Sequence, residues 1–179
     1  MLSHSLAFID IETTGISRDT GEIIELAAVI TKMKDGELTV VDQVDIKIKP
    51  KHIETADPQA LRINGYNEAD WLFAIDLEEA MKVFAEKTKG CIFVAHNVTF
   101  DYAFIEKAFI DVELENQMHF HKLDTISIAF AVLNANEDIN RYSLHALAEY
   151  YQIENKKAHS AFADAYATYE VFKKLMNLK

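Results

Sequence analysis

Two carboxylates lie close together near the start of the chain, at the end of an apolar run. Asp10 and Glu12 follow the apolar residues 6–9 and precede the polar turn Thr-Thr-Gly at 13–15. An apolar run bounded by a glycine-containing turn is typical of a buried strand. Because side chains alternate along a strand, the two carboxylates point to the same face and repel each other. A divalent cation would compensate such a pair.

Three further polar residues have surroundings that favour a role in the same site. Asp101 follows the apolar residues 92–95 and falls in the first turn of an expected helix. Asp164 lies in an alanine-rich segment, whose small side chains would let a helix approach a sheet closely. His159 precedes Asp164 by five residues. Taken singly, such a residue is more often a helix cap or a surface group, so only the joint pattern favours a site.

Convergence of the four carboxylates would create a site for hard metal ions. Oxygen ligands alone select Mg²⁺ or Mn²⁺ over zinc or copper. Four carboxylates exceed what one Mg²⁺ usually takes, and they suit two ions roughly 3.5–4 Å apart, the arrangement used in phosphoryl displacement. His159 would be placed to accept a proton from an attacking water. The sequence therefore predicts a two-metal hydrolytic site.

The hydrophobic pattern predicts the elements that position this site. Four strands are expected, the second and third joined by a hairpin at Asp35-Gly36: residues 6–12, 23–31, 38–49 and 92–95. Six helices are expected from apolar residues at helical spacing and from caps: residues 58–63 (begun by Asp57-Pro58 and ended by Asn64-Gly65), 77–89, 99–109 (with Thr99 as N-cap), 123–133 (buried), 144–151 and 160–177. This order predicts an α/β fold with a mixed central sheet, three antiparallel strands plus parallel strands, flanked by helices.

Length and charge limit the classes of function. The 179 residues, 50% of them hydrophobic, fit a single domain over residues 1–179. Lys and Arg total 18 against 29 Asp and Glu, and the formal charge of −11 argues against a long basic track for nucleic acid. That argument weakens if divalent ions return positive charge where a phosphate would bind.

Cysteine content and hydropathy predict the compartment. The single cysteine, Cys91, excludes an intrachain disulfide and a Cys-based zinc site, and its apolar neighbours favour a small buried strand residue. The N-terminal residues lack the pattern of a signal peptide, and no apolar run approaches the roughly 20 residues that span a bilayer. A soluble, cytoplasmic protein without a membrane partner is expected.

Three motifs together resemble those of the DEDD superfamily of 3′-5′ exonucleases, in the subgroup with a catalytic histidine (DEDDh). Residues 10–15 match Asp-x-Glu-Thr-x-Gly, residues 96–101 match His-Asn followed by Phe-Asp, and residues 159–164 match His-x₄-Asp. Each motif alone is weak, but three in this order over nearly the whole chain are highly specific. The family includes the proofreading epsilon subunit of bacterial DNA polymerase III, RNase T and oligoribonuclease.

The resemblance implies a ribonuclease H-like fold and a defined set of catalytic residues. Asp10, Glu12, Asp101 and Asp164 would hold two Mg²⁺ or Mn²⁺ ions, and His159 would be the general base. The implied reaction is removal of nucleoside 5′-monophosphates from a single-stranded 3′ end.

Substrate contacts are also implied by the resemblance. Thr13 and Thr14 would contact the terminal sugar, and Ile63 and Asn64 fall where the epsilon subunit places a Val-His pair beside the last base. Asn64 departs from that pattern, because an asparagine stands where the epsilon subunit has the histidine.

Two further residues of the second motif have two interpretations each. Phe100 packs near the terminal nucleotide or is a core aromatic. Asn97 contacts the substrate or fixes its loop by bonding to backbone.

Three functions are compared. The leading one is a 3′-5′ exonuclease on single-stranded DNA, because residues 12–15 look more like the epsilon sequence than the oligoribonuclease one. The second is an exoribonuclease of the RNase T or oligoribonuclease type, acting on RNA 3′ ends as a homodimer. A non-catalytic binding module is the third, and the presence of all five polar residues argues against it. A polymerase is a further candidate partner, although the short chain after the last helix favours a nuclease that acts alone.

Overall fold

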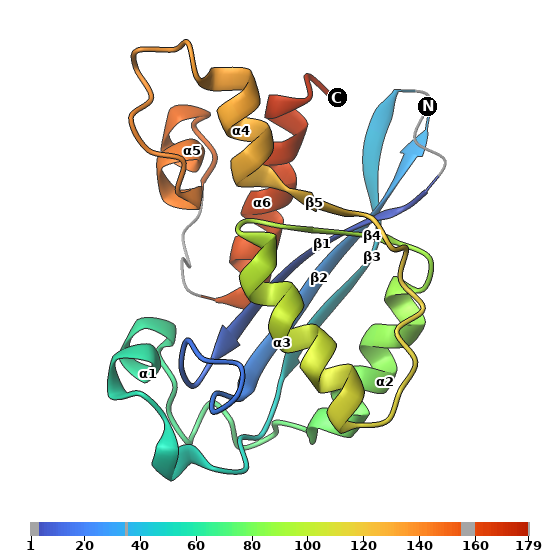
Figure 1. Cartoon of the computed structure of the whole chain (residues 1–179), viewed down its shortest axis with the longest axis vertical. Coiled ribbons are helices and arrows are strands. Elements are labelled where there is room, and N and C mark those ends of the chain that lie inside the picture. The colour runs from blue at the N-terminus through green and yellow to red at the C-terminus, as the bar shows by residue number, and fades with distance from the viewer. Residues whose placement is uncertain (1–3, 35, 155–159, 179) are drawn as a thin grey trace.

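A five-stranded mixed sheet forms the centre of the computed structural model, which describes residues 4–34, 36–154 and 160–178. The strands lie in the order β3-β2-β1-β4-β5 (Figure 1). Their bounds are Leu6–Thr13 (β1), Ile23–Lys34 (β2), Glu37–Lys47 (β3), Ile92–Ala95 (β4) and Lys122–Asp124 (β5). The pairs β1–β2 and β2–β3 are antiparallel, and β1–β4 and β4–β5 are parallel. The predicted mixed α/β sheet is therefore confirmed.

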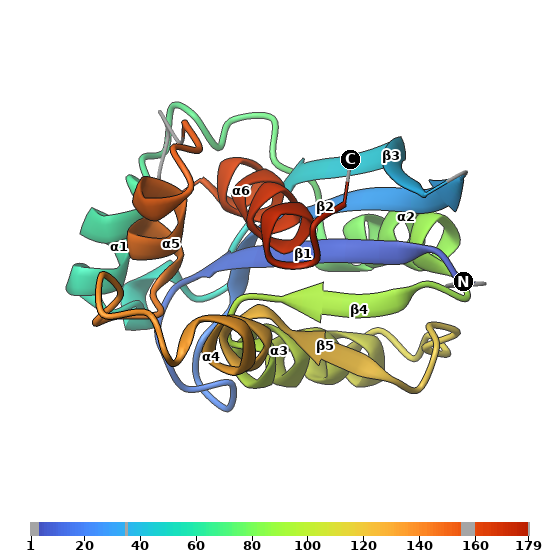
Figure 2. The same ribbon diagram turned by 90° about the horizontal axis from the view of Figure 1, so that it is seen from above.

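Helices cover both faces of this sheet. Their bounds are Ile53–Thr55 (η1, a 3-10 turn), Pro58–Asn64 (α1), Leu77–Thr88 (α2), Val98–Asp111 (α3), Thr125–Leu133 (α4), Leu144–Tyr150 (α5) and Ala161–Leu175 (α6). Helices α2 and α3 lie on one face, and α6 lies on the other (Figure 2). Helices α4 and α5 pack against the outer side of α6 through a small apolar cluster. On the second face, the helix that packs over β1 and β2 is α6, the last helix of the chain.

Strand β1 divides the core between the two faces by simple alternation. Ala7, Ile9 and Ile11 pack in the cluster under α2 and α3, whereas Leu6 and Phe8 pack in the cluster under α6. The next residues in the second series are the two carboxylates at positions 10 and 12. The carboxylates therefore lie on the face that α6 covers.

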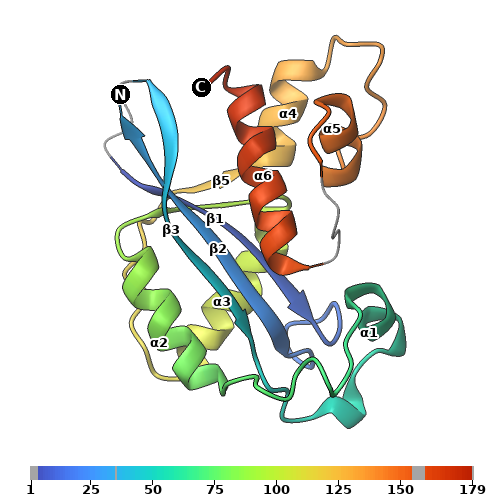
Figure 3. The same ribbon diagram turned by 180° about the vertical axis from the view of Figure 1, so that it is seen from behind.

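Small side chains let α6 approach that face. Ala161 and Ala165 are fully buried and pack in one cluster with Phe8 and with Ala27 of β2. Figure 3 shows α6 lying along this side of the sheet. The close approach predicted from the alanine-rich segment is confirmed, and it brings the first turn of the helix to the carboxylates of β1.

The expected helix over 123–133 is wrong at its start, because residues Lys122–Asp124 form the fifth strand. The helix begins at Thr125, and the Asp124 carboxylate caps it by accepting hydrogen bonds from the N–H groups of Ile126 and Ser127. A three-residue strand is too short to show a period, and its pairing with β4 decides it. The helix is also less buried than expected, since Phe130 is 58% exposed.

The start of α3 and the end of α6 also differ from expectation. The helix α3 begins at Val98 rather than after Thr99, and Asn97 precedes it in the left-handed conformation with φ of 74°. Helix α6 ends at Leu175, two residues before Asn177. Helix ends fray and are decided by local hydrogen bonds, which a hydrophobic pattern does not resolve.

Other turn and cap predictions are confirmed. Gly36 has φ of 84° in the β2–β3 turn, although Asp35 lies outside the described residues. Asp57 caps α1, with Pro58 at its first position, and Gly65 ends it at φ of 68°.

Two predictions from composition can also be compared with the structure. Cys91 is a buried free thiol, as expected, but it directly precedes β4 and is not a strand residue. In the part of the chain that the structure describes, no helix has the length and apolar character needed to cross a bilayer.

Replacement of Ala165 by leucine tests the close packing of α6. The larger side chain has no room against the sheet, so the free energy of unfolding should fall by about 1–3 kcal/mol. Urea unfolding followed by circular dichroism measures the loss. Ala131→Leu, the same change at an exposed position of α4, is the control and should stay within about 0.5 kcal/mol of the unmodified protein. Equal effects at both positions would contradict tight packing under α6.

Candidate active site

Three carboxylates from two distant segments meet on the α6 face of the sheet. One oxygen each from Asp10 and Glu12 of β1 and from Asp164 in the first turn of α6 all lie within 4.8 Å of one another. All three side chains are partly exposed. Among the described residues, this is the one group of three or more His, Cys, Asp or Glu side chains close enough to share a metal ion.

Asp101 lies beside this trio rather than within it. It is in the first turn of α3 and only 3% exposed. Its Oδ1 accepts a hydrogen bond from the N–H of Ile11 at 3.2 Å, which fastens the start of α3 to β1 between the two carboxylates of that strand. Burial raises the pKa of Asp101 to about 8, although the Ile11 hydrogen bond opposes the shift.

Crowding of the carboxylates shifts their proton affinities upward. Burial, followed by Asp101, Asp164, Glu12 and Glu25, holds the pKa of Asp10 well above its ordinary value. Burial, followed by Asp164 and Glu25, raises the pKa of Glu12 to about 7. Burial withdraws the negatively charged oxygens from water, and the neighbouring carboxylates repel their charge. Both effects favour the binding of either a proton or a cation at these oxygens.

The donor set fits divalent metal ions of the hard type. The cluster offers carboxylate oxygens only, with no thiolate or imidazole among the described members. Such oxygens select Mg²⁺ or Mn²⁺, and a divalent charge would offset the repulsion that raises the carboxylate pKa values. The residues present therefore fit the ions that the motifs imply.

His159, the predicted general base, lies outside the described residues, which resume at Ser160. Helix α6 starts immediately afterwards, with the Asp164 N–H donating to the Ser160 carbonyl at 3.0 Å. The role of His159 therefore stays a prediction from the sequence.

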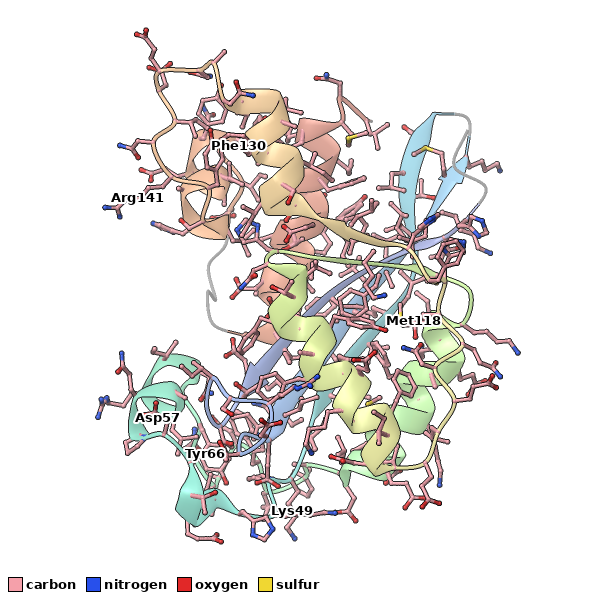
Figure 4. All side chains as sticks on the ribbon, in the orientation of Figure 1. Lys49, Asp57, Tyr66, Met118, Phe130 and Arg141 are labelled. Atoms are coloured by element: carbon pink, nitrogen blue, oxygen red, sulfur yellow. The ribbon has the colours of Figure 1, made fainter. Side chains whose placement is uncertain are left out.

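A cleft of about 410 Å³ opens next to Glu12. Its walls include Thr13 of β1, Ile63 and Asn64 of α1, and Phe100 of α3. These are four of the six residues expected to contact substrate, and the fold brings them together from three elements. Figure 4 shows Asp57, which also lines the cleft, on the same side of the molecule as α1.

The two threonine hydroxyls shape the turn after β1. Thr13 donates its hydroxyl to the carbonyl of Gly15 at 2.8 Å, and the Thr14 hydroxyl accepts the N–H of Glu22 at 2.9 Å. Thr14 is only 2% exposed. Both hydroxyls are thus engaged within the protein, and only Thr13 lines the cleft.

Asn64 is a structural link. Its Nδ2 donates to the Thr13 carbonyl at 3.0 Å, and its Oδ1 accepts the N–H of Tyr66 at 3.1 Å. The side chain is buried and fastens α1 to the end of β1. Its neighbour Ile63 is 49% exposed and faces the cleft.

Phe100 and Asn97 differ in their positions. Phe100 is half-buried, with its ring centroid 5.1 Å from that of Phe104, and it also lines the cleft, so both of its interpretations agree with the structure. Asn97 is exposed and accepts a hydrogen bond from the Thr99 hydroxyl at 2.9 Å. Of the two interpretations of Asn97, the bond to backbone is replaced by this bond to a side chain, and the contact with substrate stays a prediction.

Two residues near the site carried no role in the sequence analysis. Asp57 was expected only as a helix cap, and it fulfils that role with Oδ1 accepting the Gln59 N–H at 2.7 Å while lining the cleft. Glu25 lies directly opposite Glu12 across the β1–β2 pair. A lone charge within the otherwise apolar residues 23–31 was the signal that could have identified it.

The mixed sheet, the carboxylate trio and the adjoining cleft define the class of protein, an exonuclease-type domain of ribonuclease H-like fold. A family model described as "Exonuclease" matches residues 7–172, so the chain belongs to the exonuclease family. The assignment to the DEDDh 3′-5′ exonucleases that the three motifs indicated is thereby confirmed. This family depends on divalent metal, in agreement with the acidic cluster.

Similar proteins include a DNA polymerase and a ribonuclease. A DNA polymerase III of the PolC type from Caldanaerobacter subterraneus subsp. tengcongensis is 32% identical over 177 residues, which cover 98% of this chain and 12% of that protein. Ribonuclease T of Shewanella denitrificans is 30% identical over 182 residues, which cover 94% of this chain and 79% of that protein. The chain thus corresponds to a small part of the polymerase and to most of the ribonuclease.

Solved structures share the fold. Exonuclease I of E. coli in complex with a dT13 oligonucleotide matches with a TM-score of 0.79 and 18% identity, over 97% of this chain and 41% of that chain. A zinc-bound complex of the same enzyme with single-stranded DNA matches with a TM-score of 0.78 and 20% identity. At these identities the likeness shows the ribonuclease H-like fold alone.

The raised carboxylate pKa values predict that stability depends on pH and metal. A carboxyl group whose pKa is higher in the folded state than in the unfolded state binds its proton more tightly when the protein is folded. Below its unfolded pKa, the group is protonated in both states and does not lower the free energy of unfolding. The cost grows as the pH rises from the unfolded values, 4.5 for Glu12 and 3.8 for Asp101, to the folded values of about 7 and about 8. In EDTA, the melting temperature should therefore fall between pH 5 and pH 8. Mn²⁺ should restore it at pH 8 and have little effect at pH 5.

Differential scanning fluorimetry across this pH range measures both effects. Asp10→Asn removes one of the repelling charges, so its melting temperature in EDTA should depend less on pH. A metal-free protein whose stability stays constant or rises over this range would contradict the electrostatic account of the site.

Proposed function

We propose that this chain is a divalent-metal-dependent 3′-5′ exonuclease domain that releases nucleoside 5′-monophosphates from single-stranded 3′ ends. The observation that carries the proposal is the convergence of Asp10, Glu12 and Asp164 within 4.8 Å beside a cleft of about 410 Å³. Membership of the exonuclease family supports the same reaction. We also propose that residues 1–179 act as one domain.

Four carboxylates would hold the metal ions. Asp10, Glu12 and Asp164 form the core of the ligand set, and Asp101 completes it from the first turn of α3. Two Mg²⁺ or Mn²⁺ ions would supply Lewis-acid activation and charge neutralisation for in-line hydrolysis of a phosphodiester. Wherever these carboxylates are ionised and no cation balances them, their negative charge would repel a phosphate.

The cleft would receive the last nucleotide of a strand. Ile63 of α1 and Phe100 of α3 provide apolar surface of the kind on which a base can pack. Thr13 and Glu12 lie at the end of β1, where sugar and phosphate would meet the carboxylates. Thr14 and Asn64 would contribute less to the substrate contact, because both side chains are buried and bonded within the protein.

His159 is proposed as the general base. A histidine is suited to accept a proton from an attacking water near neutral pH. Its place in the sequence, five residues before Asp164, supports this role. The described carboxylates are otherwise committed to cation binding in the proposal.

The acidic net charge predicts weak, non-processive binding of nucleic acid. With 29 acidic and 18 basic residues, the chain offers no net positive field to hold a long strand. Only the terminal nucleotides need to enter the cleft. A partner that holds the nucleic acid, such as a polymerase or a second copy of the chain, would compensate, and a cytoplasmic location is part of the same proposal.

An exoribonuclease is the second candidate function. The observation that favours it is the extent of similarity, since the chain covers 79% of Ribonuclease T but only 12% of the PolC-type polymerase. DNA is favoured by the Glu-Thr-Thr-Gly turn at residues 12–15. Discrimination between the two depends on contacts to the 2′-hydroxyl.

Substitution of Asp164 tests the proposed reaction. Oligomers with a 5′ label should lose 3′ mononucleotides in Mg²⁺ or Mn²⁺, and EDTA should abolish the loss. Asp164→Asn should lower the rate at least about 10²-fold, because it removes a pre-placed charge from the reacting centre. Asp138→Asn, at an exposed position outside the site, should keep the original rate.

The same assay compares the two candidate substrates. A higher kcat/KM for DNA than for RNA of matched sequence supports the leading function, and the reverse supports the second. Unchanged cleavage by Asp164→Asn would overturn the two-metal proposal for either substrate.

Replacement of His159 by alanine tests the general base. The rate should fall by roughly 10²–10⁴, with Mn²⁺ affinity unchanged, because the side chain acts on a proton and does not bind metal. Single-turnover digestion and a calorimetric Mn²⁺ titration measure the two quantities. His145→Ala, at an exposed position of α5, serves as the control. Loss of Mn²⁺ binding or of folding in His159→Ala would assign this residue a structural role instead.

A further inference from the structure

A row of three charged residues crosses the sheet on the α6 face. Glu12 of β1 pairs directly with Glu25 of β2, and Glu25 pairs directly with Lys47 of β3. Like charges directly opposite each other on adjacent strands are destabilising. Glu25 therefore needs partners of its own, because its neighbour already belongs to the crowded carboxylate trio.

Each oxygen of the Glu25 carboxylate has a separate partner. Oε1 lies 2.7 Å from the Lys47 ammonium, and Oε2 accepts the backbone N–H of Ala161 at 3.0 Å. Glu25 is only 7% exposed, so these bonds form largely out of water. Charge-assisted hydrogen bonds in such a place are stronger than ordinary ones.

The Ala161 N–H is the first of the free donors at the start of α6. The preceding residue, Ser160, occupies the N-cap position, but its side chain makes no capping hydrogen bond. Glu25 supplies the capping acceptor from 136 positions away in the sequence. A carboxylate at this end also interacts favourably with the helix dipole. The start of α6 is thus tied to β2 by a side chain rather than by a local cap.

Lys47 is held in place on its other side. Its ammonium lies 3.4 Å from the centroid of the Trp71 ring, and Trp71 donates its indole N–H to the carbonyl of Ile24 at 3.0 Å. A cation between a carboxylate and an aromatic face is restricted in position. Lys47 of β3 therefore restrains one oxygen of Glu25, while the other oxygen bonds to the start of α6.

We propose that Glu25 is a positioning residue that holds Asp164 against Asp10 and Glu12. Asp164 lies in the first turn of α6, three residues after Ala161, and the two β1 carboxylates repel it. A hydrogen bond at the start of the helix opposes that repulsion and keeps the three ligands in place before a metal ion arrives. This role rests on the proposed metal-dependent function.

Mn²⁺ affinity, measured by calorimetry without nucleic acid, tests the proposal. Glu25→Ala should weaken Mn²⁺ binding roughly 10–100-fold, the effect expected when a residue that orients a metal ligand is removed. Glu25→Gln should lose less, because its amide oxygen can still accept the Ala161 N–H. Asp42→Asn is the matched control, since it removes a carboxylate of β3 that pairs with Lys87 of α2 rather than with α6. Its Mn²⁺ affinity should be unchanged.

Amide hydrogen exchange locates the effect. In Glu25→Ala, exchange should rise in the first turn of α6, and Asp42→Asn should leave that turn protected. A purely structural role would lower the melting temperature without changing the Mn²⁺ affinity of the folded protein. Original Mn²⁺ affinity in every Glu25 variant that folds would therefore overturn the proposal.

The metal readout separates this inference from the proposed function. Mn²⁺ binding needs no nuclease activity. A protein that binds Mn²⁺ with the expected order of variants but degrades neither DNA nor RNA would disprove the proposed function and leave the role of Glu25 standing.

Discussion

Repulsion among crowded carboxylates is the constraint on which the rest of this structure depends. Asp10, Glu12 and Asp164 place their oxygens within 4.8 Å of one another, with Asp101 and Glu25 close enough to raise the pKa of Asp10 further. Such an arrangement costs stability, and the fold holds it with hydrogen bonds from neighbouring backbone. Ile11 donates to Asp101, and Ala161 donates to Glu25. The two helices that carry carboxylates are thus fastened at their first turns to the sheet.

Packing and electrostatics act together at α6. The buried Ala161 and Ala165 let the helix lie close to β1 and β2, which a larger side chain would prevent. That proximity brings Asp164 to the β1 carboxylates and also brings the Ala161 N–H within reach of Glu25. The apolar contacts set the distance between helix and sheet, and the hydrogen bond fixes where along the sheet the helix starts.

The cleft beside the carboxylates is surrounded by polar side chains that bond within the protein. Thr14 and Asn64 are buried, with their polar groups bonded within the protein. Asn64 lines the cleft together with Thr13 and Ile63, and of these three Ile63 is exposed. The polar side chains thus hold the wall of the cleft together, while Ile63 leaves apolar surface exposed there. The segments that bring these residues together therefore hold the fold together as well as forming the cleft.

The sequence by itself determined the strand β1, the alternation that puts Asp10 and Glu12 on one face, and the helical places of Asp101 and Asp164. Local periodicity and caps decide those features, so they are visible in a single segment. Only the tertiary structure decided that Lys122–Asp124 is a strand, because three residues carry no period and their pairing partner β4 lies about thirty positions earlier. Likewise, Glu25 was only a lone charge in an apolar strand. Its bond to Ala161 joins residues 136 positions apart, and no local pattern records which distant N–H a carboxylate will meet.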